Sequence, residues 1–145
     1  MSLKKNIKAY CDFFENIHKN TSIDKYKLFF DDNSVFQDPF QKVQGVNKIY
    51  KVFQDMYETL HSANFKIKDY SANDKQAFIQ WKFIYKMKKS SDESSFVGVS
   101  IVKFDENSKV ISHIDYWDAA SNIYEKIPFL GAILKIIRKK ISINE

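Results

Sequence analysis

Three side chains near the end of the sequence have the types and the spacing for acid/base chemistry. His113, Asp115 and Trp117 are spaced two residues apart within the segment 110–118. Successive side chains of a β-strand point to opposite faces, so we expect these three on one face, with Ile111 before them. An imidazole next to a carboxylate suits proton transfer near neutral pH. Together with the tryptophan, the pair indicates a small-molecule pocket with an apolar wall.

Asp38 is a further acidic candidate, in the stretch Asp-Pro-Phe at 38–40. Its carboxylate either bonds to the backbone N–H groups of a turn or acts as a proton acceptor. His113 likewise is either an ordinary sheet histidine or the partner of Asp115, because a buried carboxylate needs a donor. Asp118, on the opposite face of the strand, is expected to cap the helix that follows.

The composition argues against several other classes of function. The net charge is +5, but Arg138 is the only arginine and the lysines are scattered, so we expect no nucleic-acid partner. No His, Asp or Glu cluster has metal-site spacing and no glycine-rich phosphate loop occurs, so we expect neither metal nor cofactor. Cys11 is the only cysteine, no signal-peptide pattern is present and no apolar run reaches about 20 residues. We therefore expect a cytoplasmic protein.

Hydrophobic periodicity predicts three helices in the first half of the chain. The apolar residues of the segment 7–17 fall on one helical face. A second, short helix is expected at 22–30, and a third at 47–60 with Asn47 as its cap. The polar cluster at 31–33 is expected to form a turn.

Strands are predicted mainly in the second half. A short strand is expected at 35–37, and from residue 64 onward the apolar period changes to two. The segment 77–88 reads as a long half-buried strand, and two more are expected at 96–104 and 110–118. Helices followed by a meander of strands favour an α+β fold with the helices on one face of the sheet.

The segment 119–145 is expected to be an amphipathic helical extension of the domain, with a break near Pro128. Its apolar residues recur at helical spacing: Ile123, Ile127, Leu130, Leu134, Ile137 and Ile141. One interpretation is a helix packed against the sheet or against a dimer partner. The alternative is an interfacial helix whose basic residues contact anionic lipid, namely Lys135, Arg138, Lys139 and Lys140.

Several short motifs carry a resemblance to a known family. They are Phe30-Asp31-Asp32, the stretch Phe-Gln-Asp-Pro-Phe at 36–40, Gly45 before a helix, and the segment 102–107 followed by Tyr116-Trp117. This pattern resembles the nuclear transport factor 2-like superfamily, in its ketosteroid-isomerase and SnoaL-like polyketide cyclase branch. The resemblance implies a domain at 1–118 with a cone-shaped, curved, mixed or antiparallel sheet wrapped around the N-terminal helices. It also implies an apolar cavity at the wide end and a homodimer.

The resemblance assigns roles to individual residues. Asp38 matches the general base of the isomerases, and Asp115 resembles the acid that serves SnoaL-like cyclases on the last strand. The isomerase oxyanion hole would fall near Phe14 and on Ser100. Phenylalanine cannot donate a hydrogen bond and serine is a weaker donor than a buried carboxylic acid, so the resemblance does not extend to steroid isomerisation.

The sequence thus predicts a small-molecule pocket protein with isomerase-, cyclase- or dehydratase-like acid/base chemistry on an apolar ligand. A non-catalytic ligand-binding or dimerising module of the same fold is the alternative. The expected catalytic residues are Asp38, His113 and Asp115, and the expected ligand-binding residues are Phe14, Tyr57, Trp81, Phe83, Ser100 and Trp117. The expected dimer contact is the outer sheet face, where Lys82, Lys86 and Ser112 alternate with Phe78, Ile84 and Tyr116.

Overall fold

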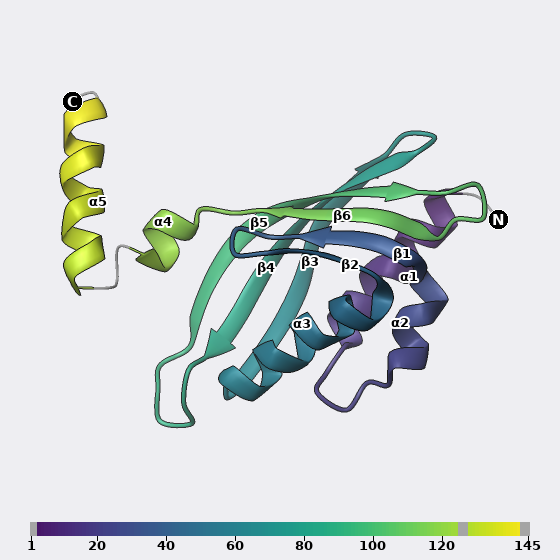
Figure 1. Cartoon of the computed structure of the whole chain (residues 1–145), viewed down its shortest axis with the longest axis horizontal. Helices are drawn as coiled ribbons and strands as arrows, with labels where there is room; N and C mark the ends of the chain where they lie inside the picture. Colours follow the sequence, from purple (N-terminus) through teal and green to yellow (C-terminus); the bar gives the residue numbers. More distant parts are fainter. Residues whose placement is uncertain (1–2, 125–127, 143–145) are drawn as a thin grey trace.

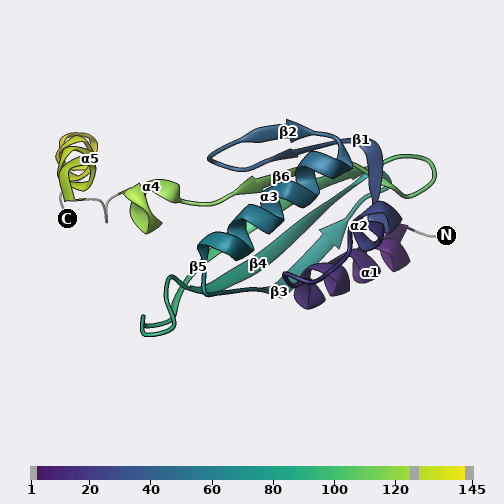
Figure 2. The same cartoon turned by 60° about the horizontal axis from the view of Figure 1, so that its bottom comes forward.

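The computed structural model describes residues 3–124 and 128–142, which form a curved six-stranded sheet with three helices on its concave side (Figures 1 and 2). The helices before the long strands are α1 (Leu3–Asn16), α2 (Ile23–Phe29) and α3 (Val46–Thr59). The strands are β1 (Phe30–Gln37), β2 (Lys42–Gln44), β3 (Ser62–Ala72), β4 (Gln76–Lys86), β5 (Ser94–Phe104) and β6 (Val110–Tyr116). Two helices follow, α4 (Ala119–Asn122) and α5 (Pro128–Ile141). The predicted α+β class and curved mixed sheet are confirmed.

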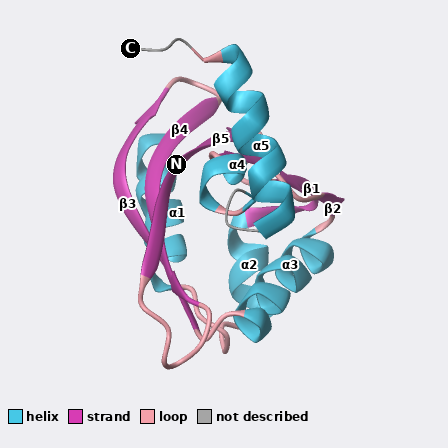
Figure 3. Cartoon of the chain, turned by 90° about the vertical axis from the view of Figure 1, so that its left-hand side faces the viewer, coloured by secondary structure: helices cyan, strands magenta, loops and turns pink. Residues whose placement is uncertain are grey.

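The sheet order is β2-β1-β6-β5-β4-β3, and only the β1–β6 pair is parallel. This parallel pair brings the Asp38 turn, which follows β1, beside the end of β6, which carries Asp115. The strands from β3 to β6 form an antiparallel meander, as the alternating pattern predicts. The strong curvature leaves a concave face on which α1, α2 and α3 lie (Figures 2 and 3).

The core lies between the concave face and these helices. The predicted apolar face of α1 is buried, including the ring of Tyr10, which is 0% exposed. On β4, Ile79, Trp81 and Phe83 point inward, and the residues between them point outward and are more exposed. The apolar side chains of the strand alternate with more polar ones, so one face packs on the helices and the other faces solvent.

Two local predictions are wrong. Residues 31–33 belong to β1 rather than to a separate turn, although the backbone N–H of Asn33 donates to the Asp31 carboxylate at 3.0 Å. The pairing register of β1 with β6 shifts between Phe30 and Val35, which accommodates this local bond inside the strand. Helix α3 begins at Val46 after Gly45, whose φ of 103° few other residues adopt, and not at an Asn47 cap.

Ile111 does not share the face of His113 as predicted. The β5–β6 register shifts here, since Ser112 pairs with Lys103 while Val110 pairs with Phe104. Ile111 is therefore an extra residue that bulges outward, and it is 41% exposed while Val110 is fully buried. The alternation predicted from 110 onward is valid only after this bulge.

The predicted break near Pro128 is confirmed, because α4 ends at Asn122 and α5 begins at Pro128. Of the interpretation that this helix packs against the sheet or against a dimer partner, the first part is wrong, since α5 stands apart from the sheet (Figures 1 and 2), and the second stays a prediction. The concave face is already occupied by α1, α2 and α3. The predicted apolar residue Ile127 lies outside the described residues. Among the described helices, none is long and apolar enough to cross a membrane.

Candidate functional site

A cavity of about 370 Å³ opens between α3 and the concave face of the sheet. Its lining is largely aromatic and aliphatic: Phe36, Phe40, Val52, Phe53, Met56, Leu60, Phe65, Trp81, Phe83, Tyr85, Met87, Phe96, Trp117 and Ile123. Its polar lining is Asp38, Gln41, Asp55, Thr59 and Asp115. A cavity of this size with few polar groups fits a small apolar molecule.

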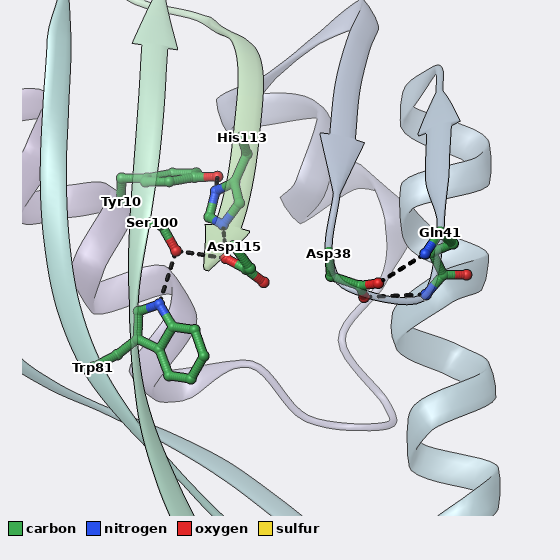
Figure 4. A network of polar contacts seen from close by, with 7 residues as sticks. All are labelled: Tyr10, Asp38, Gln41, Trp81, Ser100, His113 and Asp115. Atoms are coloured by element: carbon green, nitrogen blue, oxygen red, sulfur yellow. Dashed lines mark hydrogen bonds and ion pairs between the residues drawn. The ribbon is translucent and has the colours of Figure 1, made fainter. Parts of the chain in front are cut away.

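Asp115 is the carboxylate that the sheet holds most firmly at this cavity. Its side chain is 13% exposed. The Ser100 hydroxyl donates to Asp115 Oδ1 at 2.5 Å, and His113 Nε2 lies 2.7 Å from the same oxygen. Both described hydrogen bonds therefore reach Oδ1, and Figure 4 shows the other oxygen directed away from both partners.

The hydrogen bonds around Asp115 have one consistent direction. Indole N–H is only a donor, so Trp81 Nε1 donates to Ser100 Oγ at 2.8 Å, and the Ser100 proton goes to Asp115. On the other side, Tyr10 Oη lies 2.7 Å from His113 Nδ1. If the phenol donates to Nδ1, the imidazole proton is on Nε2 and donates to Asp115, so both branches end on an ionised carboxylate.

His113 lies behind Asp115 rather than in the large cavity. It is 4% exposed, and its ring packs against Phe36 with ring centroids 5.2 Å apart. With Phe14 and Ser100 it lines a separate space of about 20 Å³. The position makes His113 a donor that orients the carboxylate, and a ligand in the large cavity would meet Asp115 first.

Tyr10 is a site residue that the sequence analysis missed. Burial raises the pKa of this phenol well above its ordinary value, and the charge of Asp115 raises it further. Tyr10 therefore keeps its proton and remains a donor across the physiological range. The available signal was a phenol on the otherwise apolar face of the first helix, because a buried Tyr hydroxyl usually finds a partner.

Asp38 borders the same cavity but its carboxylate is engaged in a turn. Oδ1 accepts from the backbone N–H groups of Phe40 at 2.8 Å and Gln41 at 3.1 Å. Oδ2 accepts from the Gln41 side chain at 3.2 Å (Figure 4). These contacts match the interpretation of Asp38 as a turn residue. Of the two acids expected to be catalytic, only Asp115 has an oxygen directed away from its hydrogen-bond partners.

The structure separates the remaining candidates. Trp81, Phe83 and Trp117 line the large cavity, whereas Phe14 and Ser100 line only the small space beside it. Tyr57 is absent from both linings. Its neighbour is Tyr26 of α2, and the Tyr57 hydroxyl is buried without a hydrogen-bond partner among the described residues.

Aromatic residues from three distant segments meet at one side of the cavity. Trp117 stacks on Phe96 with ring centroids 4.2 Å apart and contacts Phe40 at 5.5 Å. Phe40 also contacts Tyr124, which follows α4. Phe40 is 53% exposed, so this cluster borders the cavity at the molecular surface. No cluster of three or more His, Cys, Asp or Glu side chains suited to a metal ion occurs among residues 3–124 and 128–142.

The sequence matches the model of the SnoaL-like domain family over residues 7–113, so the chain belongs to the SnoaL-like family. A search of curated proteins found no match. A solved structure described as a SnoaL-like polyketide cyclase from Jannaschia sp. CCS1 is similar, with a TM-score of 0.70, 10% identity, and coverage of 81% of this chain and 88% of that one.

Two further solved structures share the fold. An LEH-like epoxide hydrolase from M. tuberculosis has a TM-score of 0.66 at 13% identity, covering 97% of this chain and 95% of that chain. An NTF2-like protein of unknown function from Burkholderia pseudomallei K96243 has a TM-score of 0.69 at 8% identity, covering 83% and 95%. At these identities the likeness concerns the fold, and the predicted membership of the superfamily is confirmed.

Proposed function

We propose that this SnoaL-like protein is a cofactor-independent acid/base enzyme that acts on an apolar, ring-containing small molecule. The observation that carries the proposal is Asp115, a carboxylate held by two donors at one oxygen in a cavity with an aromatic lining. The reaction class is isomerisation, cyclisation or dehydration. The polyketide cyclase and epoxide hydrolase descriptions of similar structures agree with a small-molecule substrate.

In this mechanism Asp115 removes a proton from a carbon next to a carbonyl group. The electron pair of the broken C–H bond becomes the enolate, and the proton moves to the oxygen of Asp115 that His113 and Ser100 do not bond. Asp115 then returns the proton to the same molecule at another atom, which restores the carboxylate. His113 and Ser100 fix the carboxylate rather than contact the substrate, and the aromatic walls exclude water.

The experiment is proton exchange in deuterated water with a panel of cyclic ketones, followed by NMR. The native protein is expected to speed deuterium incorporation next to the carbonyl. Asp115→Asn is expected to lower that rate by about 10²–10⁴-fold, because the amide cannot accept the proton. Circular dichroism and the melting temperature check that the fold is retained.

Asp118→Asn is the matched control. Asp118 Oδ1 accepts from the backbone N–H of Ser121 at 2.9 Å and caps α4, and this bond lowers the pKa of its carboxyl. Asn caps a helix about as well, so exchange is expected to stay at the native rate. A folded Asp115→Asn protein with the native exchange rate would remove Asp115 from the mechanism.

The second candidate function is ligand binding without chemistry, and the bonding of Asp38 favours it. Both Asp38 oxygens accept hydrogen bonds within the turn, so Asp38 is not available as the acid/base partner of Asp115. In that case, cyclic ketones or aromatic compounds are expected to bind, and binding is measured by quenching of Trp81 and Trp117 fluorescence. No deuterium incorporation next to the carbonyl is then expected.

We also propose that the chain forms a homodimer through the outer face of the sheet. The register places Val99 beside Tyr116 and Ile101 between Phe78 and Ile114, which makes a continuous apolar patch across β4, β5 and β6. Val99 and Tyr116 are 40% and 54% exposed. Contiguous exposed apolar surface of this kind often marks an interface.

A further inference from the structure

We infer that α5 is an interfacial anchor that binds the surface of an anionic membrane. This helix has an unusual combination of position, apolar exposure and charge. It lies away from the sheet, on the far side of α4 (Figures 1 and 2). The inference is independent of the chemistry at Asp115.

The apolar side of α5 is exposed. Five large apolar side chains of the helix are between 38% and 78% exposed: Leu130, Ile133, Ile136, Ile137 and Ile141. With about 3.6 residues per turn, these five and Leu134 fall within an arc of about 160°. A water-soluble helix normally buries such an arc, so its exposure calls for a partner that covers it.

The orientation of α5 follows from its contact with the domain. Gly131 is buried, and the Arg138 guanidinium donates to Ser121 Oγ at 2.6 Å. Gly131 and Arg138 fall outside the apolar arc. The helix therefore turns the side of Gly131 and Arg138 toward α4, and most of its apolar arc faces outward, as in a helix that lies flat on a surface.

Charge complementarity selects anionic lipid as the partner. The helix contains Lys135, Arg138, Lys139 and Lys140 and no Asp or Glu. Lys135 and Lys139 lie opposite the apolar arc, whereas Lys140 falls inside it, between the directions of Ile136 and Ile133, near the end of the helix. A basic polar face with a broad apolar face is typical of helices that lie in the lipid headgroup region. Each lysine or arginine near an anionic surface adds to the attraction.

The segment 123–124, which lies between α4 and α5 in the chain, reaches the ligand cavity. Ile123, which follows α4 in the chain, lines the cavity, and Tyr124 contacts Phe40 at its border. A membrane bound to α5 therefore lies at the end of the domain where the short 123–124 segment meets the cavity.

The test is co-sedimentation of the full chain with vesicles of phosphatidylcholine alone or mixed with phosphatidylglycerol. The native protein is expected to bind the mixed vesicles at least about tenfold more strongly than the neutral ones, with binding that weakens as salt is added. Failure to bind the mixed vesicles, or equal binding to both compositions, would overturn the inference.

Two lysine pairs give a matched comparison. Lys139→Glu with Lys140→Glu is expected to lower binding to the mixed vesicles at least about tenfold. Lys88→Glu with Lys89→Glu changes the net charge equally, but lies in the exposed loop after β4 and is expected to change binding less than about threefold. Equal losses from both pairs would mean that only net charge matters, against an anchor at α5.

The apolar face is tested with Ile133→Gln combined with Ile137→Gln, which leaves the charge unchanged. Loss of binding to the mixed vesicles with an unchanged melting temperature supports the anchor. If these substitutions leave vesicle binding intact, the apolar face does not contact the membrane and the anchor is wrong. If the native protein does not bind vesicles and the substitutions instead dissociate a dimer, a second copy covers the helix and the anchor is likewise wrong.

Discussion

At the scale of single residues, the site depends on which oxygen of Asp115 is occupied. The two donors converge on Oδ1, and their own partners, Trp81 and Tyr10, are buried. Buried donors with second partners have restricted rotamers, which holds the carboxylate in one orientation. The same arrangement explains why His113 and Ser100 contribute to the site without facing the large cavity.

Replacing Tyr10 with phenylalanine is expected to destabilise the fold by about 1–3 kcal/mol. The ring still fits, but His113 Nδ1 loses its described partner in a buried position, and an unsatisfied buried polar atom carries that penalty. Urea unfolding measures the free energy. The deuterium-exchange rate is expected to fall less than with Asp115→Asn, because the imidazole remains in place.

Tyr26→Phe is the control for this substitution. The Tyr26 hydroxyl is equally buried but has no hydrogen-bond partner among the described residues. Removing it is expected to leave the free energy of unfolding unchanged or higher. If both variants lose the same stability, the Tyr10–His113 hydrogen bond has no special contribution.

At the scale of elements, Gly98 of β5 determines where the Trp81 indole lies. The two residues are paired across β4 and β5, and a Cβ on residue 98 would collide with carbons of the indole ring. The absence of a side chain at 98 is thus what lets Trp81 reach Ser100 while lining the cavity.

Gly98→Ala is therefore expected to destabilise the domain by about 1–3 kcal/mol and to alter ligand binding in the cavity. The added methyl group displaces the indole and disturbs its hydrogen bond to Ser100. Denaturant unfolding and Trp fluorescence report the two effects. Ser95→Ala, at an exposed position of the same strand, is the control and is expected to change neither. Native stability and fluorescence for Gly98→Ala would show that the indole has room to move.

At the scale of the whole molecule, buried acidic protons make the fold sensitive to alkaline pH. Burial raises the pKa of the Cys11 thiol from 9.0 to about 12 and that of the Tyr57 phenol from 10.0 to about 12. It also raises the pKa values of Tyr10 and Tyr26. Since the folded values lie above the unfolded ones, the stabilising contribution is complete below the unfolded values and is lost as pH rises toward the folded ones.

We expect the free energy of unfolding to be flat near neutral pH and to fall from the ordinary thiol value of 9.0 toward about 12. Phenolate absorbance during an alkaline titration checks this directly. Tyr10, Tyr26 and Tyr57 are expected to ionise only together with unfolding. Ionisation of all eight tyrosines in one step in the folded protein would contradict the burial argument.

The dimer proposal also belongs to the whole molecule. Analytical ultracentrifugation at micromolar concentration is expected to show a dimer for the native chain. Val99→Glu is expected to give a monomer, because it places a charge in the apolar patch. Leu28→Glu, on α2, is 63% exposed and lies outside the patch, so its dimer is expected to persist. A native monomer would exclude the outer face as an interface.

The sequence by itself determined the elements whose signal is local. The apolar spacing of 7–17 predicted a buried face, and the alternation of 77–88 placed Trp81 and Phe83 on the inner side. Asp118, on the opposite face of its strand, was predicted to cap the helix that follows, and its capping bond to Ser121 is present. Such features depend on neighbours within a few residues, so the residue pattern reports them.

Tertiary structure decided the features that depend on distant residues. The bulge at Ile111 follows from the β5–β6 register, and the hydrogen bond of Tyr10 to His113 joins residues 103 positions apart. Tyr57 has helical spacing suited to the cavity, yet the orientation of α3 places it near Tyr26 instead. The outward position of α5 was likewise not predictable, because periodicity identifies an apolar face but not what, if anything, the folded chain places against it.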